Sequence, residues 1–329
     1  MPGQTSNNYH TQLSVKEIDE KHYEPFARAI RIILSTDIAK FTYAQIIDGL
    51  PTYEVFLDTR YSRNHILHPI QHHKELCPGV VDKTERFLRN FNPNTLAFDS
   101  RLLNAYKNAS VGDDIFNIRL LEMTAVAIHQ IAVQLFKRDE SLHKHDGATA
   151  WERPDSAYAN DRVWDPHPTL FHHVYYVCYN QYPEGVADMV RYWAENRILG
   201  GVVIFDRRGS GFGRNKVFFH SDRQDVTDRI YRLLDSQIQT LLEFLQQPAT
   251  PPTKTCPLPI LGDKYNRERI DIDVAIQYHG VFRDRWERKI PDSGYFLFGR
   301  NHRCIRLELD YPEVEYEIRG WQRRNGIVE

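Results

Sequence analysis

Apolar positions in the first half of the chain recur at helical spacing. The clearest stretch runs from Asp113 to Lys137, where every third or fourth residue is apolar: Ile115, Ile118, Leu121, Ala125, Ile128, Ala132 and Leu135. This spacing lines one face of an α-helix, and Asp113 is suited to cap its first turn. A shorter stretch with the same spacing lies around Phe26 to Leu34. The pattern predicts a mainly helical region over 16–140, with 52–58 as a short strand or an extended link.

The middle of the chain changes to shorter apolar runs. Aromatic and valine residues at 170–179 predict a strand. Pro183 then opens a helix that Gly200 ends. Strands follow at 202–205 and 217–220, and a helix with Ser221 and Gln224 at capping-box spacing continues to Leu245. The order β-α-β-β-α predicts an α+β core unit over 169–250, with a sheet that carries helices on one side.

Polar segments separate and flank these regions. Residues 1–15 predict a disordered tail. Residues 141–168, rich in His, Asp, Pro and Trp, predict a long irregular loop of the kind that often carries function. Residues 251–329 begin with a proline-rich stretch and predict an extended linker followed by C-terminal strands at 295–298 and 304–309.

Composition narrows the classes of partner. Forty-two basic and 44 acidic residues give a formal charge of -2, so the chain lacks the bulk positive field that drives non-specific nucleic-acid binding. No apolar run approaches about 20 residues, and the N-terminus has no apolar signal segment. We therefore expect an intracellular protein, in the cytoplasm or the nucleus, without nucleic-acid or membrane partners. The oligomeric state cannot be read from these features.

Histidine is unusually frequent, with 15 among the 329 residues. Because histidine is the commonest metal ligand and general base, the excess raises the hypothesis of a divalent metal site. His72 and Glu75 could share a helix face, although a solvated polar turn also explains them. His220 and Asp222, with the more distant His279, imitate the donor set of a non-heme iron site, but capping of the next helix explains Asp222 equally well. His129 is expected to be a hydrogen-bonded core histidine.

The preferred site joins the long loop to the aromatic strand. His143, His145 and Asp146 lie within four residues of one another and supply acid–base and ligand chemistry, while the strand adds His172 and His173. Neighbouring strand residues point to opposite faces, so at most one of these two histidines faces a given pocket. We predict His145, Asp146 and His173 as catalytic residues. The alternative is a disordered loop that merely connects the two halves.

Other cofactor chemistry finds no support in the sequence. The glycine-rich turn at 209–213 matches neither a dinucleotide fingerprint nor a nucleophile elbow, and no phosphate-binding loop is present. The four cysteines have no C-x-x-C spacing and are expected to be free thiols: Cys77, Cys178, Cys256 and Cys304.

Several blocks carry a family resemblance. They read QYPEGVADMVRYWAENRILGGVVIFDR at 181–207, VFFHSDRQDVTDRIYRLLDSQ at 217–237 and CPLPILGDKYNRERID at 256–271. Together with FRDRWERK and LDYPE further on, this string resembles a widespread family of uncharacterised proteins from filamentous fungi. The resemblance covers about residues 165–312 and implies an intracellular fungal protein, in some members encoded within secondary-metabolite gene clusters. It carries no catalytic residues over.

Two hypotheses for function follow. The first is an accessory small-molecule enzyme of fungal secondary metabolism, working by acid–base chemistry as isomerases and cyclases do, or by histidine-bound metal. The second is a non-catalytic interaction or regulatory protein. A closed pocket with converging polar groups favours the first, and a shallow convex surface favours the second.

Overall fold

The computed structural model describes residues 11–60, 68–143, 147–148, 151, 167–208, 216–248, 255–284, 286–288 and 323–324. Within them the predicted α+β class and the helical N-terminal half are confirmed. The helices of the first half are α1 Glu20–Ser35, α2 Asp37–Asp48, α3 Tyr53–Leu57, α4 Val80–Arg89, α5 Ser100–Asn108 and α6 Asp114–Phe136. The later helices are α7 Val186–Leu199, α8 Asp235–Leu245 and α9 Ile272–Ala275.

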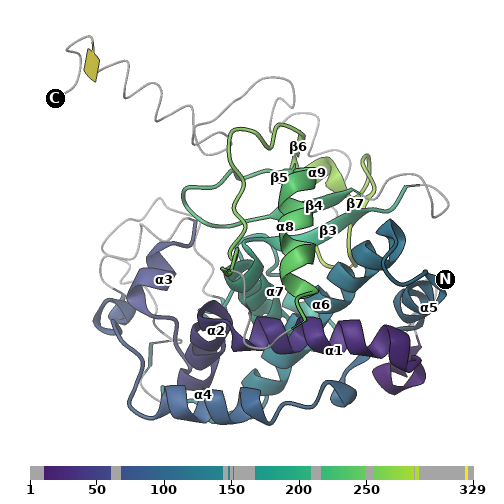
Figure 1. Cartoon of the computed structure of the whole chain (residues 1–329). Coiled ribbons are helices and arrows are strands. Elements are labelled where there is room, and N and C mark those ends of the chain that lie inside the picture. The colour runs from purple at the N-terminus through teal and green to yellow at the C-terminus, as the bar shows by residue number, and fades with distance from the viewer. Residues whose placement is uncertain are drawn as a thin grey trace, which may run out of the picture.

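A five-stranded antiparallel sheet occupies the second half. Its order is β6-β5-β4-β3-β7, so the chain forms a meander from β3 to β6 and then adds β7 at the other edge. The bounds are β3 Val202–Asp206, β4 Val217–His220, β5 Ile230–Arg232, β6 Arg269–Ile270 and β7 Val281–Phe282. In Figure 1 this sheet lies above the layer formed by α1, α2 and α4, and α8 crosses in front of it.

Both faces of the sheet are buried, as the uninterrupted apolar runs of β3 and β4 require. Val203, Phe205 and Phe219 face the main core, which they share with α1, α6 and α8. Val202, Ile204 and Phe218 face a second core that contains Tyr176 and Tyr192. Helices α1, α6 and α8 cover the first face, while α7, α9 and aromatic side chains of 175–182 cover the second. The prediction of helices on one side of the sheet is therefore wrong, because helices pack on both faces.

The strand predicted at 170–179 is wrong. This segment turns back on itself, since the Tyr176 N–H donates to the His173 carbonyl over 2.8 Å and the Tyr179 N–H donates to the Val177 carbonyl over 2.9 Å. A short 3-10 helix, Tyr179–Gln181, follows. Its aromatic residues pack against the second face of the sheet instead of joining the hydrogen-bond ladder.

The helix predicted from Ser221 to Leu245 divides into two elements. Residues 230–232 form β5 beside β4, and α8 begins at Asp235. The order in the structure is therefore α7-β3-β4-β5-α8. Ile230 and Tyr231 are buried on opposite faces of the sheet, which a helical stripe does not explain.

Two shorter predictions also need correction. Residues 53–57 form a helix instead of a strand or a link. Within the predicted tail, Gln12–Ser14 form β1, which pairs with β2, Ala97–Asp99, and the next residue Val15 is fully buried. The first ten residues and the predicted strands at 295–298 and 304–309 lie outside the described residues.

Helix α6 is the central helix of the helical half. Asp113 caps it as predicted, accepting from the Phe116 N–H over 2.6 Å. Of the helices that the structure describes, α6 is the one long and apolar enough to cross a membrane, but 72% of its most apolar window is buried against other elements. It packs on α1, α2, α5 and α7, which is the position of a core helix.

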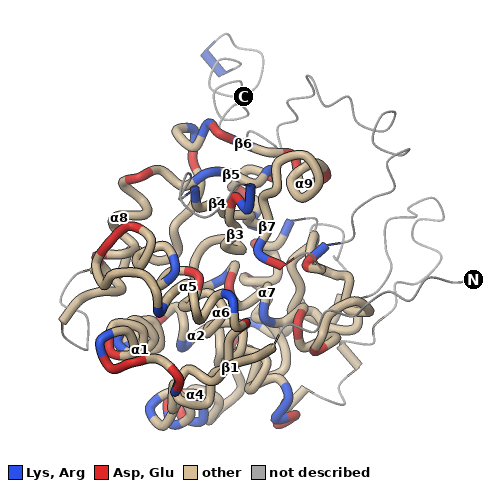
Figure 2. The backbone as a smooth tube through the Cα atoms, turned by 90° about the vertical axis from the view of Figure 1, so that its right-hand side faces the viewer, with Lys and Arg blue, Asp and Glu red and all other residues tan. Residues whose placement is uncertain are grey.

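Charges of both signs are interleaved over the elements. Lysine, arginine, aspartate and glutamate alternate along α1 and α4, and again near β5 and β6 (Figure 2). This distribution agrees with the near-zero net charge of the sequence.

Candidate metal centre

Four side chains from three separate segments converge at one end of the helical half. Asp48 is the last residue of α2, His73 and Cys77 lie between the 3-10 helix Pro69–His72 and α4, and His143 follows α6. Each offers a ligand atom, and these atoms all lie within 4.8 Å of one another. Among the residues that the structure describes, this is the one group of His, Cys, Asp or Glu close enough to hold a metal ion.

Backbone hydrogen bonds bring the three segments together. The Tyr53 N–H donates to the His73 carbonyl over 2.7 Å and fixes the second segment beside the start of α3. The Leu142 N–H donates over 3.0 Å to the Asp48 carbonyl, which lies at the C-terminal end of α2 and has no partner within the helix. These two bonds hold the backbone at His73 and Asp48, and the backbone just before His143, in place.

Three distances between side-chain atoms of the centre are close to those between ligands of a four-coordinate metal. His73 Nε2 lies 3.1 Å from Asp48 Oδ2, His143 Nε2 lies 3.5 Å from Asp48 Oδ1, and Cys77 Sγ lies 3.3 Å from His143 Nε2. Tetrahedral zinc, with bonds of about 2.0–2.3 Å, separates its ligand atoms by roughly 3.3–3.8 Å. The four donors therefore surround a volume suited to a small cation.

Both ring nitrogens of His73 face acceptors. Nδ1 lies 2.9 Å from the Pro51 carbonyl oxygen and Nε2 lies 3.1 Å from Asp48 Oδ2. If Nδ1–H donates to the carbonyl, the neutral ring has only a lone pair at Nε2. That lone pair then faces the oxygen of Asp48, and the two acceptors repel each other. A proton or a metal ion at Nε2 removes this conflict. A backbone carbonyl on the other nitrogen is also the usual outer partner of a metal-bound histidine.

Asp48 is a fully buried carboxylate with an unused oxygen. Its side chain is 0% exposed, Oδ2 accepts from the Cys77 N–H over 3.1 Å, and Oδ1 has no hydrogen-bond partner. Burial raises the pKa of Asp48, but the hydrogen bonds from His73 and Cys77 outweigh it and hold that pKa below its ordinary value. The charged form is therefore favoured, and a buried charged oxygen that has no hydrogen bond, with His143 Nε2 at 3.5 Å, calls for a cation.

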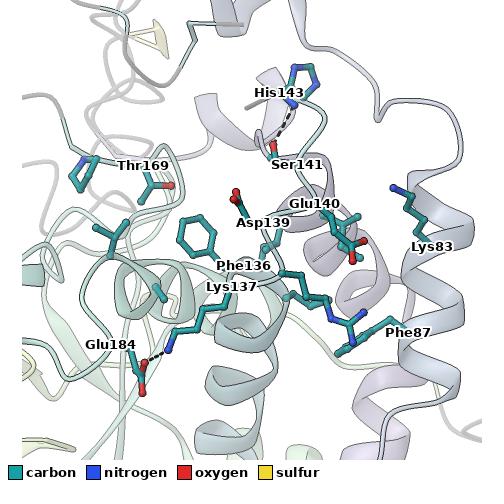
Figure 3. A pocket seen from close by; sticks show the side chains of 18 residues that line it. Lys83, Phe87, Phe136, Lys137, Asp139, Glu140, Ser141, His143, Thr169 and Glu184 are labelled. Carbon is teal, nitrogen blue, oxygen red and sulfur yellow. Dashed lines mark hydrogen bonds and ion pairs between the residues drawn. The ribbon is translucent and has the colours of Figure 1, made fainter. Parts of the chain in front are cut away.

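A hollow of about 510 Å³ borders the centre. His143 forms part of its rim, and α2, α6 and α7 form an apolar wall with Ile46, Ile47, Leu135, Phe136 and Val186. Figure 3 shows His143 and Ser141 at one end and the Lys137–Glu184 ion pair at the other, with Asp139 between them. Of the four donors, His143 alone lines this hollow, so the other three lie behind it.

Of the three predicted catalytic residues, the structure describes His173 alone. His145 and Asp146 lie outside the described residues, directly after His143. His173 is fully buried elsewhere, beside β4: its Nε2–H donates to the His220 carbonyl over 3.1 Å and its Nδ1 accepts from the Tyr175 N–H over 3.3 Å. Burial lowers the pKa of His173. Both nitrogens are engaged within the core, and a catalytic role for His173 stays a prediction.

The other histidine hypotheses have structural outcomes. His72 and Glu75 are exposed and share no helix, because the 3-10 helix ends at His72. Asp222 caps no helix; its side chain accepts from Asn196 in the core. His129 is a buried, hydrogen-bonded core histidine as expected, paired with Glu195 beside Arg283.

Three members of the centre are not predicted as site residues by the sequence: Asp48, His73 and Cys77. Asp48 looks like an ordinary polar residue at a helix end, and Cys77 like a free thiol. A weak signal was present, since Cys77 follows His73 by four residues and a thiol near a histidine is a common pair of zinc ligands.

Comparison with known proteins adds no relative. No protein-family description matches the chain, and searches of curated proteins and of solved structures give no significant match.

Proposed function

We propose that the chain binds a divalent transition-metal ion, zinc by preference, through Asp48, His73, Cys77 and His143. The convergence of these four donors around the unused oxygen of Asp48 carries the proposal. A set of one sulfur, two imidazoles and one carboxylate suits zinc, whereas calcium and magnesium prefer oxygen ligands throughout.

A catalytic relay of cysteine, histidine and aspartate fits the geometry less well. In such a relay the nucleophile and the carboxylate contact opposite nitrogens of the histidine. Here the same nitrogen, His143 Nε2, faces both Cys77 Sγ at 3.3 Å and Asp48 Oδ1 at 3.5 Å. Several donors that face one point are expected of a metal site.

Metal analysis tests the proposal. Full-length protein purified without chelators should contain a single zinc ion per chain, and cobalt substitution should give a thiolate-to-cobalt absorption band. Cys77→Ala and Asp48→Asn should lose the metal. His72→Ala is the matched control, because His72 is adjacent to His73 but exposed. Zinc-free wild type under zinc-replete conditions contradicts the proposal.

We further propose that the chain is a small-molecule enzyme that uses the adjoining hollow. Its volume of about 510 Å³ lies in the usual range of ligand pockets, roughly 300–1,000 Å³, and it combines an apolar wall with polar groups. Four protein ligands leave no open coordination position, so the metal would fix the pocket rim instead of touching substrate. Acid–base groups that line the hollow are Asp139, Glu140 and Lys83. His145 and Asp146, which lie outside the described residues, stay candidates from the sequence alone.

The fungal, intracellular setting in secondary metabolism belongs to the same proposal and rests on the sequence resemblance. Metabolite profiling of a deletion strain tests it. Wild type and His72→Ala should restore the missing product, whereas Val186→Phe, which fills the hollow from α7, should not while it keeps its zinc. His145→Ala should also fail to restore it if the loop supplies the acid–base group.

A non-catalytic interaction or regulatory protein is the second candidate. The closed set of four protein ligands favours it, because such sites are structural in most proteins. An unchanged metabolite profile in the deletion strain, together with stoichiometric zinc, would support this candidate over the enzyme.

A further inference from the structure

The side chain of Ser141 fills the space that a Cβ atom at position 49 would need, so the close contact requires glycine there. Gly49 ends α2 with φ of +102°, in the left-handed region. A Cβ added to it would fall onto Ser141 Oγ and lie 2.6 Å from Ser141 Cβ, closer than real Cβ atoms approach. The serine side chain therefore sits directly on the bare Cα of Gly49.

From this position Ser141 contacts the backbone of two metal donors. Its hydroxyl donates to the Asp48 carbonyl over 3.2 Å, and its oxygen accepts from the His143 N–H over 3.1 Å. Figure 3 shows the second of these bonds at the rim of the hollow. One hydroxyl thus links the end of α2 to the segment that carries His143.

We infer that Ser141, seated on Gly49, is the positioning residue of the metal centre. The inference rests on the proposed metal site and adds the element that fixes two of its four donors. Asp48 ends α2 and His143 follows α6, and the Ser141 hydroxyl, together with the Leu142 N–H, sets the spacing between them before a metal binds. Groups outside the ligand shell that orient ligands change metal affinity by about 10–100-fold when removed.

Substitutions at the two positions separate positioning from folding. Ser141→Ala should weaken zinc binding by about 10–100-fold in competition with a chelator of known affinity, and should alter the cobalt absorption spectrum. Gly49→Ala should weaken it further. Gly112→Ala is the matched control, since Gly112 has φ of +91° and an added Cβ would meet nothing within 4 Å, so this change adds the same backbone strain without a clash.

A double-mutant cycle tests the contact itself. In a Ser141→Gly background, Gly49→Ala should cost much less zinc affinity than in wild type, because the colliding Oγ and Cβ are gone. The unfolding midpoint of each variant with excess chelator reports folding without the metal. Ser141→Ala should leave this midpoint nearly unchanged.

The outcomes distinguish this inference from the proposed function. If wild type binds zinc and Ser141→Ala binds it equally well, the positioning role is overturned and the metal site stands. If the metal-free midpoint falls while zinc affinity stays constant, Ser141 acts in folding alone, which also overturns the inference. If wild type binds no zinc, the proposed metal site itself fails.

Discussion

Two buried carboxylates in this protein are neutralised in different ways. Glu195, in α7, receives the guanidinium of Arg283 at 2.8 Å and the Val203 N–H at 2.9 Å, and its second oxygen pairs with His129. Asp48, at the end of α2, receives the Cys77 N–H and faces imidazoles of His73 and His143. One of its oxygens has no hydrogen-bond partner.

The comparison indicates where an external cation is needed. At Glu195 the chain supplies a permanent positive charge, since arginine stays protonated at any physiological pH. At Asp48 the described residues supply imidazoles, which carry no permanent positive charge. The first site is complete by itself, whereas the second is completed by a proton or a metal ion.

The largest expected effect is the loss of stability when Glu195 loses its arginine partner. Arg283→Met leaves Glu195 buried without its cation and should lower the free energy of unfolding by about 3–5 kcal/mol. The loss should be the same with zinc and with chelator, as measured by urea unfolding. Arg101→Met is the control, since Arg101 is largely exposed and should change stability little. A loss below about 1 kcal/mol would mean that Arg283 does not neutralise Glu195.

Removal of the metal from the centre around Asp48 should lower the free energy of unfolding by a similar amount. Free zinc at about 1,000 times its dissociation constant stabilises the folded state by about 4 kcal/mol, and excess chelator should remove this. Asp48→Asn should unfold at the same urea concentration with and without zinc. If zinc stabilises Asp48→Asn as much as wild type, the ion binds elsewhere.

The buried histidines should make the stability of the protein depend on pH. Burial lowers the pKa of His173 and lowers that of His220 well below its ordinary value, so both stay neutral in the folded protein. Below pH of about 6.5 the unfolded chain binds protons that the folded chain does not. Stability should be full above that pH and fall by about 1.4 kcal/mol per pH unit for each histidine as the pH decreases.

Urea unfolding between pH 5.5 and 7.5 with excess chelator measures this slope without the metal. His220→Gln should reduce the slope by one histidine's share. In a separate titration without chelator, acid should weaken zinc binding, because protons compete with a metal ion for its ligands. A stability that rises toward acid pH would contradict the buried neutral state of these histidines.

The smallest effect concerns an exposed charge pair beside the hollow. Lys137 and Glu184 form an ion pair whose side chains are 53% and 43% exposed. Such pairs contribute about 0–1 kcal/mol, so Lys137→Met should leave the unfolding midpoint and the zinc content nearly unchanged. A larger loss would show that this pair closes the hollow more firmly than its exposure suggests.

Local signals were sufficient for several elements. The apolar stripe and the capping Asp113 placed α6, and Gly200 marked the end of α7 before β3. These features succeed because a helix with a regular stripe and a cap forms largely the same way in many surroundings. At 170–179 local composition predicted the wrong element, because a segment rich in aromatic residues can form a strand or can pack over the face of a sheet.

The sequence by itself determined the α+β class, the helical first half and the abundance of histidine that suggested a metal. Tertiary structure decided which histidines meet. His73 and His143 are brought together by the end of α2 and by the turn after α6, while His173 is buried beside His220. Periodicity and caps act over a few residues, but a metal centre depends on the packing of segments that are far apart in the chain. Locally, only the four-residue spacing of His73 and Cys77 hints at the centre, and nothing around Asp48 does.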